Sequence, residues 1–216
     1  MFQRKPLRED LYKEILARIG DGRLPAGQRI NESRLSADLG ISRTPLREAM
    51  LGLEAQGFLQ SDMGRGFMVP VLCAEEFLEI QGILTHLKPL ALGASFPVPP
   101  PRIMELQNLL SRAVMKSREG SPDRAVALMD LVYRWSHLIL GTCPNRMLAR
   151  DILRLEGLAR RYWHEAVILD FDPTGFYASL QEFYELLRTD RRDDAVSHWG
   201  GHIERFSREA ARDLPT

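Results

Sequence analysis

The sequence predicts a mainly α-helical chain with two domains, residues 1–72 and 73–216. Three observations carry this prediction. Apolar residues recur at a spacing of three and four along most of the chain, which is typical of amphipathic helices. One short extended pattern with a glycine-rich tip lies between residues 58 and 71. From residue 74 onward the helical spacing continues without any strand pattern, so the second domain is expected to be an all-α bundle.

Composition excludes a strongly charged protein. The chain has 29 basic and 29 acidic side chains, and residues 1–71 hold 11 of the former and 9 of the latter. Because the net charge is zero, a charged partner would have to bind a local patch of opposite charge. The two cysteines, Cys73 and Cys143, form no CxxC pattern and are expected to be buried thiols in a reducing compartment.

The ends and apolar runs of the sequence indicate a soluble cytoplasmic protein. The first residues, MFQRKPLRED, lack the apolar core of a signal peptide. No apolar run approaches the roughly 20 residues that a membrane-spanning helix needs.

The first domain is predicted to begin with three helices. Residues 7–19 form the first helix, which the glycines and Pro25 of the following turn end. Asn31 can cap a short second helix through residue 39, and Gly40 supplies a sharp turn. Ser42 then caps a third helix that runs to about residue 56. Pro45 lies in its first turn, where the missing N–H removes no helical hydrogen bond.

Two extended segments follow, residues 58–61 and 67–71, with Gly64, Arg65 and Gly66 between them as a hairpin tip. The order helix, helix, turn, helix, hairpin is that of a winged helix-turn-helix. In this motif the start of the second helix of the pair reaches base edges in the major groove of DNA.

The stretch GISRTPLREAMLGLEAQGFL, residues 40–59, supports this interpretation. Helical spacing directs Leu46 and Met50 inward and leaves Arg43 and Arg47 on the outer face. Cations at the first turn oppose the helix dipole and cost about 0.3–1 kcal/mol each. An external polyanion would offset that cost.

In the second domain, helices are predicted over residues 75–95, with a bend or break at Pro89, and then over five further segments. A linker with four prolines is expected over residues 96–101. The further helices are expected at 103–118, 122–141, 146–168, 175–189 and 192–213, so the bundle has about six helices.

Residues 12–71 resemble the DNA-binding domain of GntR-family bacterial transcription regulators. The resemblance rests on I-x-x-G-x-L-P-x-G from residue 19, E-x-x-L-x-x-x-L-G from residue 32, SRTPLREAM at 42–50, L-x-x-x-G from residue 53 and G-x-G at 64–66. The one departure is Met50, where the family has Leu.

This resemblance implies the residues that contact DNA. Arg43 and Arg47 would read guanine by bidentate hydrogen bonds, and Arg34 on the preceding helix would join them. Ser42 and Thr44 would contact phosphate, helped by backbone N–H groups at the helix start. The set is completed by the wing, whose Gly64, Arg65 and Gly66 would approach the minor groove.

The helical half resembles the effector domain of the FadR-type subgroup, called FCD. Two segments carry the likeness, SHLILGTCPNRML at 136–148 and ELLRTDRRDDAVSHWGGHI at 185–203. In many members, His and Asp side chains hold a divalent metal that helps bind a small carboxylate. Here His137 and His202 match that pattern. The expected Asp position holds Tyr133, and a further expected His position holds Leu180.

The nearest replacements for the missing ligands are Asp130 and His198, with His164 and Glu182 as further alternatives. Such a set suits Zn, Ni, Mn or Fe. The alternative is that these histidines are hydrogen-bonded core residues and that no metal binds. Arg134, Arg154 and Arg161, with Arg160 beside them, are candidates to clamp the effector carboxylate or to form ordinary salt bridges. Trp135 and Trp163 are expected to fill the core.

The resemblance implies a sequence-specific DNA-binding transcription regulator, most often a repressor, that a small organic acid controls. As a homodimer it would place two recognition helices on a palindromic operator. The alternative is a DNA-binding protein whose helical domain serves dimerisation alone, with no effector or metal. An enzyme is not expected, since the sequence lacks HExxH, GxSxG and P-loop motifs.

Overall fold

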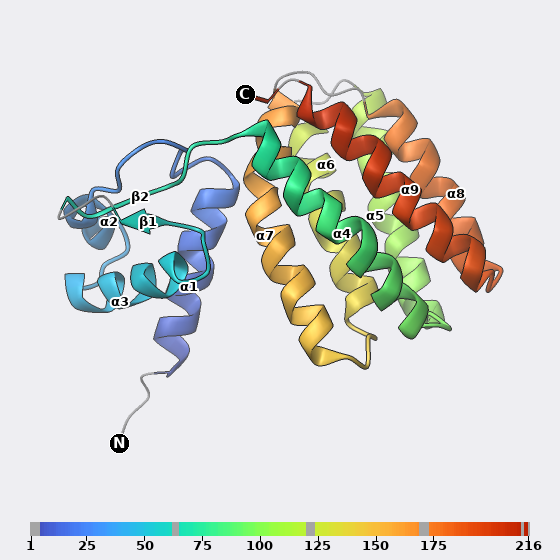
Figure 1. Ribbon diagram of the computed structural model, residues 1–216, viewed down its shortest axis with the longest axis horizontal. Helices are drawn as coiled ribbons and strands as arrows, with labels where there is room; N and C mark the ends of the chain where they lie inside the picture. Colours follow the sequence, from blue (N-terminus) through green and yellow to red (C-terminus); the bar gives the residue numbers. More distant parts are fainter. Residues whose placement is uncertain (1–4, 62–64, 120–123, 169–172, 213, 216) are drawn as a thin grey trace. The chain divides into compact units, whose positions relative to one another are not determined.

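The structure is a computed structural model that describes residues 5–61, 65–119, 124–168, 173–212 and 214–215. The chain divides into two compact units, Met1–Cys73 and Ala74–Thr216, and each is described by itself. The predicted mainly α fold is confirmed, with an N-terminal helix-turn-helix unit and a helical second unit (Figure 1).

The first unit contains α1 (Lys5–Gly20), α2 (Glu32–Asp38), α3 (Arg43–Glu54), β1 (Gln60–Ser61) and β2 (Phe67–Met68). Helices α1 and α2 both pack against α3. Their shared core consists of apolar side chains exposed by 7% or less, namely Leu11, Ile15, Ile19, Leu35, Leu46, Ala49, Met50 and Leu53. Burial of the inward face of α3 therefore fixes which face the helix leaves to solvent.

The two wing strands are shorter than the sequence predicts, but β2 pairs with the chain on both of its sides. Strands β1 and β2 are antiparallel, with Gln60 opposite Met68 and Ser61 opposite Phe67. On the other side of β2, an isolated bridge joins Arg29 and Met68. The Ile30 N–H donates to the Phe67 carbonyl over 2.8 Å. The loop before α2 thus braces the base of the wing.

The second unit is a bundle of helices, as predicted. Its elements are α4 (Ala74–Ala94), α5 (Pro100–Arg118), α6 (Arg124–Leu140), α7 (Arg146–Ile168), α8 (Thr174–Arg188) and α9 (Arg192–Ala211). Helix α4 runs along α9 and also contacts α7, while α5 contacts α6 and α8 (Figure 1). No helix in the described ranges is long and apolar enough to cross a membrane.

The structure settles one proline-containing segment that the sequence leaves open and corrects another. Helix α4 continues through Pro89 without a break. Pro89 leaves the Thr85 carbonyl without its usual donor, and Gly200 of α9 lies against both residues. The proline-rich segment is also shorter than expected, because Pro100 and Pro101 form the first turn of α5. Proline suits that turn, since its fixed φ is helical and its missing N–H would be unpaired there anyway.

Candidate nucleic-acid interface and bundle cavity

The turn between α2 and α3 forms as the sequence predicts. The Asn31 side chain caps α2 by accepting a hydrogen bond from the Arg34 N–H over 3.0 Å. Gly40 has a φ of +65°, a region that side chains with a Cβ rarely adopt. Ser42 is the N-cap residue of α3, but its side chain makes no capping hydrogen bond. The Ser42 hydroxyl therefore stays exposed for another partner.

Helix α3 separates its two faces sharply. Leu46, Met50 and Leu53 are completely buried. On the opposite face Arg43, Thr44 and Arg47 are exposed. An Arg43 N–H donates to Ser33 Oγ over 2.6 Å, which ties the start of α3 to α2. The Arg47 guanidinium makes no hydrogen bond or ion pair with any described residue.

Two groups can be distinguished among the described arginines of this unit. Arg18 and Arg23 lie within 3.2 Å of a Glu14 oxygen, and Arg23 also pairs with Asp21. By contrast, the exposed guanidiniums of Arg34, Arg47 and Arg65 have no carboxylate partner among the described residues. These three side chains and Arg43 all belong to the helix-turn-helix and the wing, so these elements carry exposed arginines that no described carboxylate pairs with.

The wing approaches the start of α2. Gly66 has a φ of +99°, and a Cβ there would lie 3.2 Å from Glu32 Oε1. Arg65 beside it is exposed. The predicted contact residue Gly64 lies outside the described residues.

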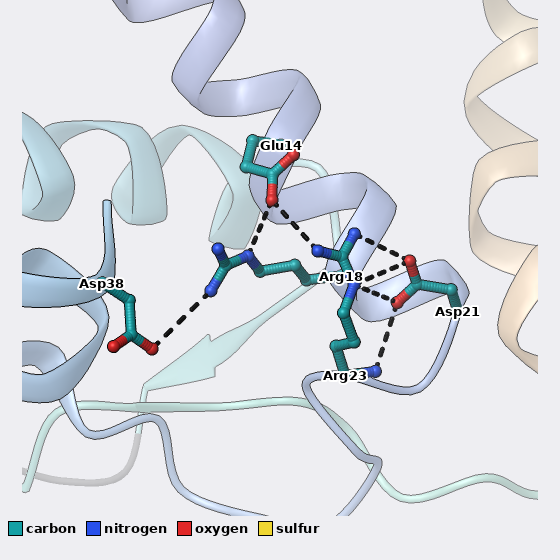
Figure 2. Close-up of polar contacts among 5 residues, drawn as sticks. All are labelled: Glu14, Arg18, Asp21, Arg23 and Asp38. Carbon is teal, nitrogen blue, oxygen red and sulfur yellow. Dashed lines mark hydrogen bonds and ion pairs between the residues drawn. The ribbon is translucent and has the colours of Figure 1, made fainter. Parts of the chain in front are cut away.

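A network of ion pairs fixes α1 against α2 (Figure 2). Arg18 Nε donates to Glu14 Oε1 over 2.8 Å, and Arg18 Nη1 lies 3.9 Å from Asp38 Oδ2. Hydrogen bonding from Arg18 holds the pKa of Glu14 below its ordinary value. The carboxylate of Asp21 raises the pKa of Arg23. These contacts pair Arg18 and Arg23 with carboxylates, unlike Arg34, Arg47 and Arg65, which have no carboxylate partner among the described residues.

In the bundle, the predicted metal ligands do not form one site. His202 Nδ1 lies 2.9 Å from Ser179 Oγ, and His198 Nε2 lies 2.9 Å from the Ser179 carbonyl oxygen. His137 Nδ1 instead lies 2.8 Å from the Tyr133 carbonyl oxygen, and Asp130 pairs with Arg134 over 3.6 Å. Among the residues that the structure describes, no three His, Cys, Asp or Glu side chains are placed to hold a metal ion.

The predicted effector arginines have internal partners. Arg134 pairs with Glu105 over 3.1 Å, and the buried Arg161 pairs with Glu76 over 3.0 Å. Arg154 is exposed. None of the three lines either cavity of the bundle core described next.

The core of the bundle holds two adjoining cavities of about 40 and 30 Å³. Both are lined by Gln81, Lys88, Val132 and Trp163. The larger is otherwise mostly aromatic, and the side chains that line it include Trp135, Phe176, Trp199, His202 and Phe206. The smaller is also lined by Glu156 and Arg160. A space of this size holds a few water molecules or a small ligand.

His202 is kept neutral by its surroundings. Burial lowers the pKa of His202 well below its ordinary 6.5, and the nearby His198, Lys88 and Arg205 lower it further. Its ring packs on Phe176, Trp199 and Phe206 with centroids 4.7–5.1 Å away. His202 is therefore expected to form its hydrogen bonds as a neutral imidazole.

This pKa shift predicts a pH-dependent bundle. Below pH 6.5 the unfolded chain binds a proton at His202 that the folded chain excludes, so stability is expected to fall as the pH decreases from 7 to 5. Thermal unfolding followed by tryptophan fluorescence measures this. His202→Gln should flatten the dependence, whereas His86→Gln, at an exposed position of α4, should not. An equally steep dependence in His202→Gln would refute the assignment.

The geometry of the first unit defines a winged helix-turn-helix DNA-binding domain. Residues 7–69 match the model of the bacterial regulatory proteins of the gntR family, so the first unit contains a DNA-binding domain of this type.

Known relatives agree with this assignment. YdhC of Bacillus subtilis, an HTH-type transcriptional regulator, is 40% identical over 81 residues, which are 38% of this chain and 36% of YdhC. A probable D-xylose utilization operon transcriptional repressor of Paenarthrobacter nicotinovorans is 38% identical over 77 residues, 36% of this chain and 34% of that protein. The chain thus matches about a third of the length of these relatives. Their names describe transcriptional regulators.

The fold of the whole chain also has a solved counterpart. Escherichia coli McbR/YncC superimposes with a TM-score of 0.81 at 19% identity, over 95% of this chain and 97% of that one. At this identity the likeness concerns the fold alone.

Sequence reasoning missed two charged residues of the bundle core, Lys88 and Glu156, whereas it named Arg160 among the candidates to clamp a carboxylate. One signal was present. Lys88 is the one Asp, Glu, Lys or Arg residue in the mainly apolar stretch ILTHLKPLAL of α4, and a charged side chain that is buried there needs a partner.

Proposed function

We propose that the protein is a bacterial transcription regulator that binds a specific DNA operator and responds to a small carboxylate in its helical unit. The DNA-binding part rests on the exposed arginines of the helix-turn-helix and the wing, which pair with no carboxylate in the described part of the chain. Arg43 and Arg47 project from the start of α3, where this motif contacts base edges. Arg34 and Arg65 lie on the adjoining elements and would contact phosphate or the minor groove.

The proposed protein acts in the cytoplasm as a homodimer and as a repressor. A single α3 contacts only one half-site, whereas two copies related by a twofold axis can read a palindrome about one DNA turn long or less. The repressor role is supported by the name of the relative from Paenarthrobacter nicotinovorans. In repression the effector would weaken DNA binding by favouring another arrangement of the two copies.

Helix α4 offers a face for dimerisation. Ile83 and Leu90 lie two turns apart on one face of the helix and are 49% and 61% exposed. Apolar side chains gathered on one helix face are typical of a protein interface.

A charge on this face is expected to separate the dimer. Ile83→Glu would bury a carboxylate in the interface and should convert the protein to a monomer, as measured by light scattering after size-exclusion chromatography. Met147→Glu on α7 is the matched control, because Met147 is 60% exposed and lies on another helix. A dimer that persists in Ile83→Glu would exclude this face as the interface.

The effector part of the proposal is tested with DNA. Fluorescence anisotropy on an operator obtained by selection should show weaker binding when a carboxylate that stabilises the protein is added. A carboxylate that binds without changing DNA affinity would remove the regulatory role. If no carboxylate raises the melting temperature, the result favours the alternative in which the helical unit only dimerises.

A further inference from the structure

At specific positions, the residues of the bundle core differ from the metal ligands that the resemblance to metal-binding regulators implies. Leu180, which stands where a metal-binding histidine is expected, lines the same cavity as His202. From α6 the cavity is lined by Val132 and Ser136, which lie one turn apart on one helix face. His137 is the next residue and bonds to the Tyr133 carbonyl instead. Of these positions only His202 has a typical metal-binding side chain, so the residues present do not fit a divalent metal.

A lysine supplies positive charge in the same place. Lys88 lines both cavities, and its Nζ lies 2.5 Å from Glu156 Oε1. The two side chains are only 13% and 8% exposed. Glu156 Oε2 is buried and has no hydrogen-bond partner among the described residues. Burying an ion pair costs free energy of folding when one carboxylate oxygen lacks a hydrogen-bond partner. A contact that served only to hold two helices together would not be expected to carry this cost.

Glu156 has a second cation within reach. Arg160 follows it by four residues on α7, the spacing at which a Glu–Arg pair forms readily, and both line the smaller cavity. No ion pair joins Glu156 and Arg160 in the described part of the chain. Instead, the Arg160 guanidinium lies 4.5 Å from the centroid of the Tyr133 ring, and its buried Nε has no hydrogen-bond partner there.

We propose that Lys88 binds the carboxylate of a small anionic ligand without a metal, and that the ligand displaces Glu156, which then pairs with Arg160. This proposal rests on the effector site of the proposed function and deepens it. The ligand-free core holds two cations and one carboxylate, so a second carboxylate balances the charge. Trp135 Nε1, which is buried and without a partner among the described residues, is a further donor at the cavity.

The exchange also gives the ligand a way to act on the fold. In the ligand-free protein, the Lys88–Glu156 pair joins α4 to α7. After the exchange, Glu156 is paired within α7, and Lys88 is paired with the ligand. Glu156 and Lys88 each keep a partner of opposite charge in both states, so a ligand can shift the balance between them. Helix α4 begins at Ala74, directly after the DNA-binding unit in the chain.

The three tryptophans of the chain, Trp135, Trp163 and Trp199, all line the larger cavity, so their fluorescence reports on it directly. The experiment titrates EDTA-treated protein with acetate, lactate, pyruvate, malonate, succinate and glutarate, with chloride at equal ionic strength as the control. At least one carboxylate is expected to give a saturable change. Lys88→Met should weaken its binding about ten- to hundredfold. Lys13→Met, at an exposed position of α1, should have no effect.

Two further variants test the displacement of Glu156. Glu156→Gln removes the internal competitor and should tighten carboxylate binding. Arg160→Met should weaken binding in the wild-type background but not in Glu156→Gln, where no displaced carboxylate needs a partner. Because Lys88→Met alone leaves Glu156 unpaired, the double variant Lys88→Met/Glu156→Gln is measured with it, since replacing both charges of a buried pair is usually tolerated. The double variant should bind carboxylates as weakly as Lys88→Met.

The proposal is overturned if none of the six carboxylates gives a saturable change, if a folded variant without Lys88 retains wild-type affinity, or if EDTA abolishes binding. Unchanged affinity in Glu156→Gln would overturn the displacement step. These outcomes differ from failure of the proposed function. A carboxylate that binds through Lys88 without affecting operator affinity would leave this site in place and remove only its role in regulation.

Discussion

Arg47→Ala is expected to abolish sequence-specific DNA binding while leaving the protein folded and dimeric. Arg47 is exposed at the start of α3 and has no partner among the described residues, so its removal costs the fold little. A bidentate arginine–guanine contact contributes about 1–3 kcal/mol, and a dimer loses it in both half-sites, which amounts to about 2–6 kcal/mol per operator. Anisotropy titrations of labelled operator and of an unrelated duplex measure the loss.

Further variants separate base recognition by Arg47 from the general effect of removing an arginine. Arg150→Ala removes an exposed arginine of α7, 66% exposed in its side chain, and should leave DNA affinity unchanged. Arg43→Ala should resemble Arg47→Ala, but it also removes the bond from Arg43 to Ser33. Ser33→Ala separates these effects, because it breaks that bond and keeps the arginine. Specific binding that survives in Arg47→Ala would refute the assignment of α3 as the recognition helix.

Leu46→Ala is expected to destabilise the DNA-binding unit by about 2–5 kcal/mol. Leu46 lies on α3 next to Arg47, but its side chain is completely buried. Its truncation leaves a cavity in the core that α3 shares with α1 and α2. Since domains are stable by only about 5–15 kcal/mol, this loss should expose the unit to proteolysis and lower DNA affinity for every sequence alike.

Leu51→Ala is the matched control on the same helix. Leu51 is 51% exposed, so the same truncation should change stability by less than about 0.5 kcal/mol. Urea unfolding followed by circular dichroism, together with limited proteolysis, measures both variants. Equal effects at the two positions would contradict the orientation of α3 on which the DNA-binding account depends.

Much of the first unit could be predicted because its signals are local. Asn31 caps α2, Gly40 adopts a positive φ, and the apolar spacing of α3 determines its buried face. The wing strands were overestimated, since only Gln60–Ser61 and Phe67–Met68 pair as strands. Strand pairing depends on partners distant in sequence, and here the loop at Arg29 takes part of the edge of β2.

The bundle site was harder to predict because it depends on packing between helices. The resemblance to the FadR-type subgroup implied one metal site for His137 and His202, but in the structure His137 Nδ1 lies against the Tyr133 carbonyl oxygen. The buried pair of Lys88 and Glu156 joins residues on two helices that are far apart in sequence. No periodicity within either helix identifies such a partner, whereas the local resemblance favoured histidines and arginines.

The most direct test of the central claim is selection of DNA from a random duplex library by the full-length protein, beside the Arg43→Ala/Arg47→Ala variant. The account predicts that the wild-type protein enriches one palindromic sequence whose half-sites contain guanine, and that the folded variant enriches none. Enrichment of the same sequence by both proteins, or of no sequence by the wild type, would contradict the claim that α3 reads an operator.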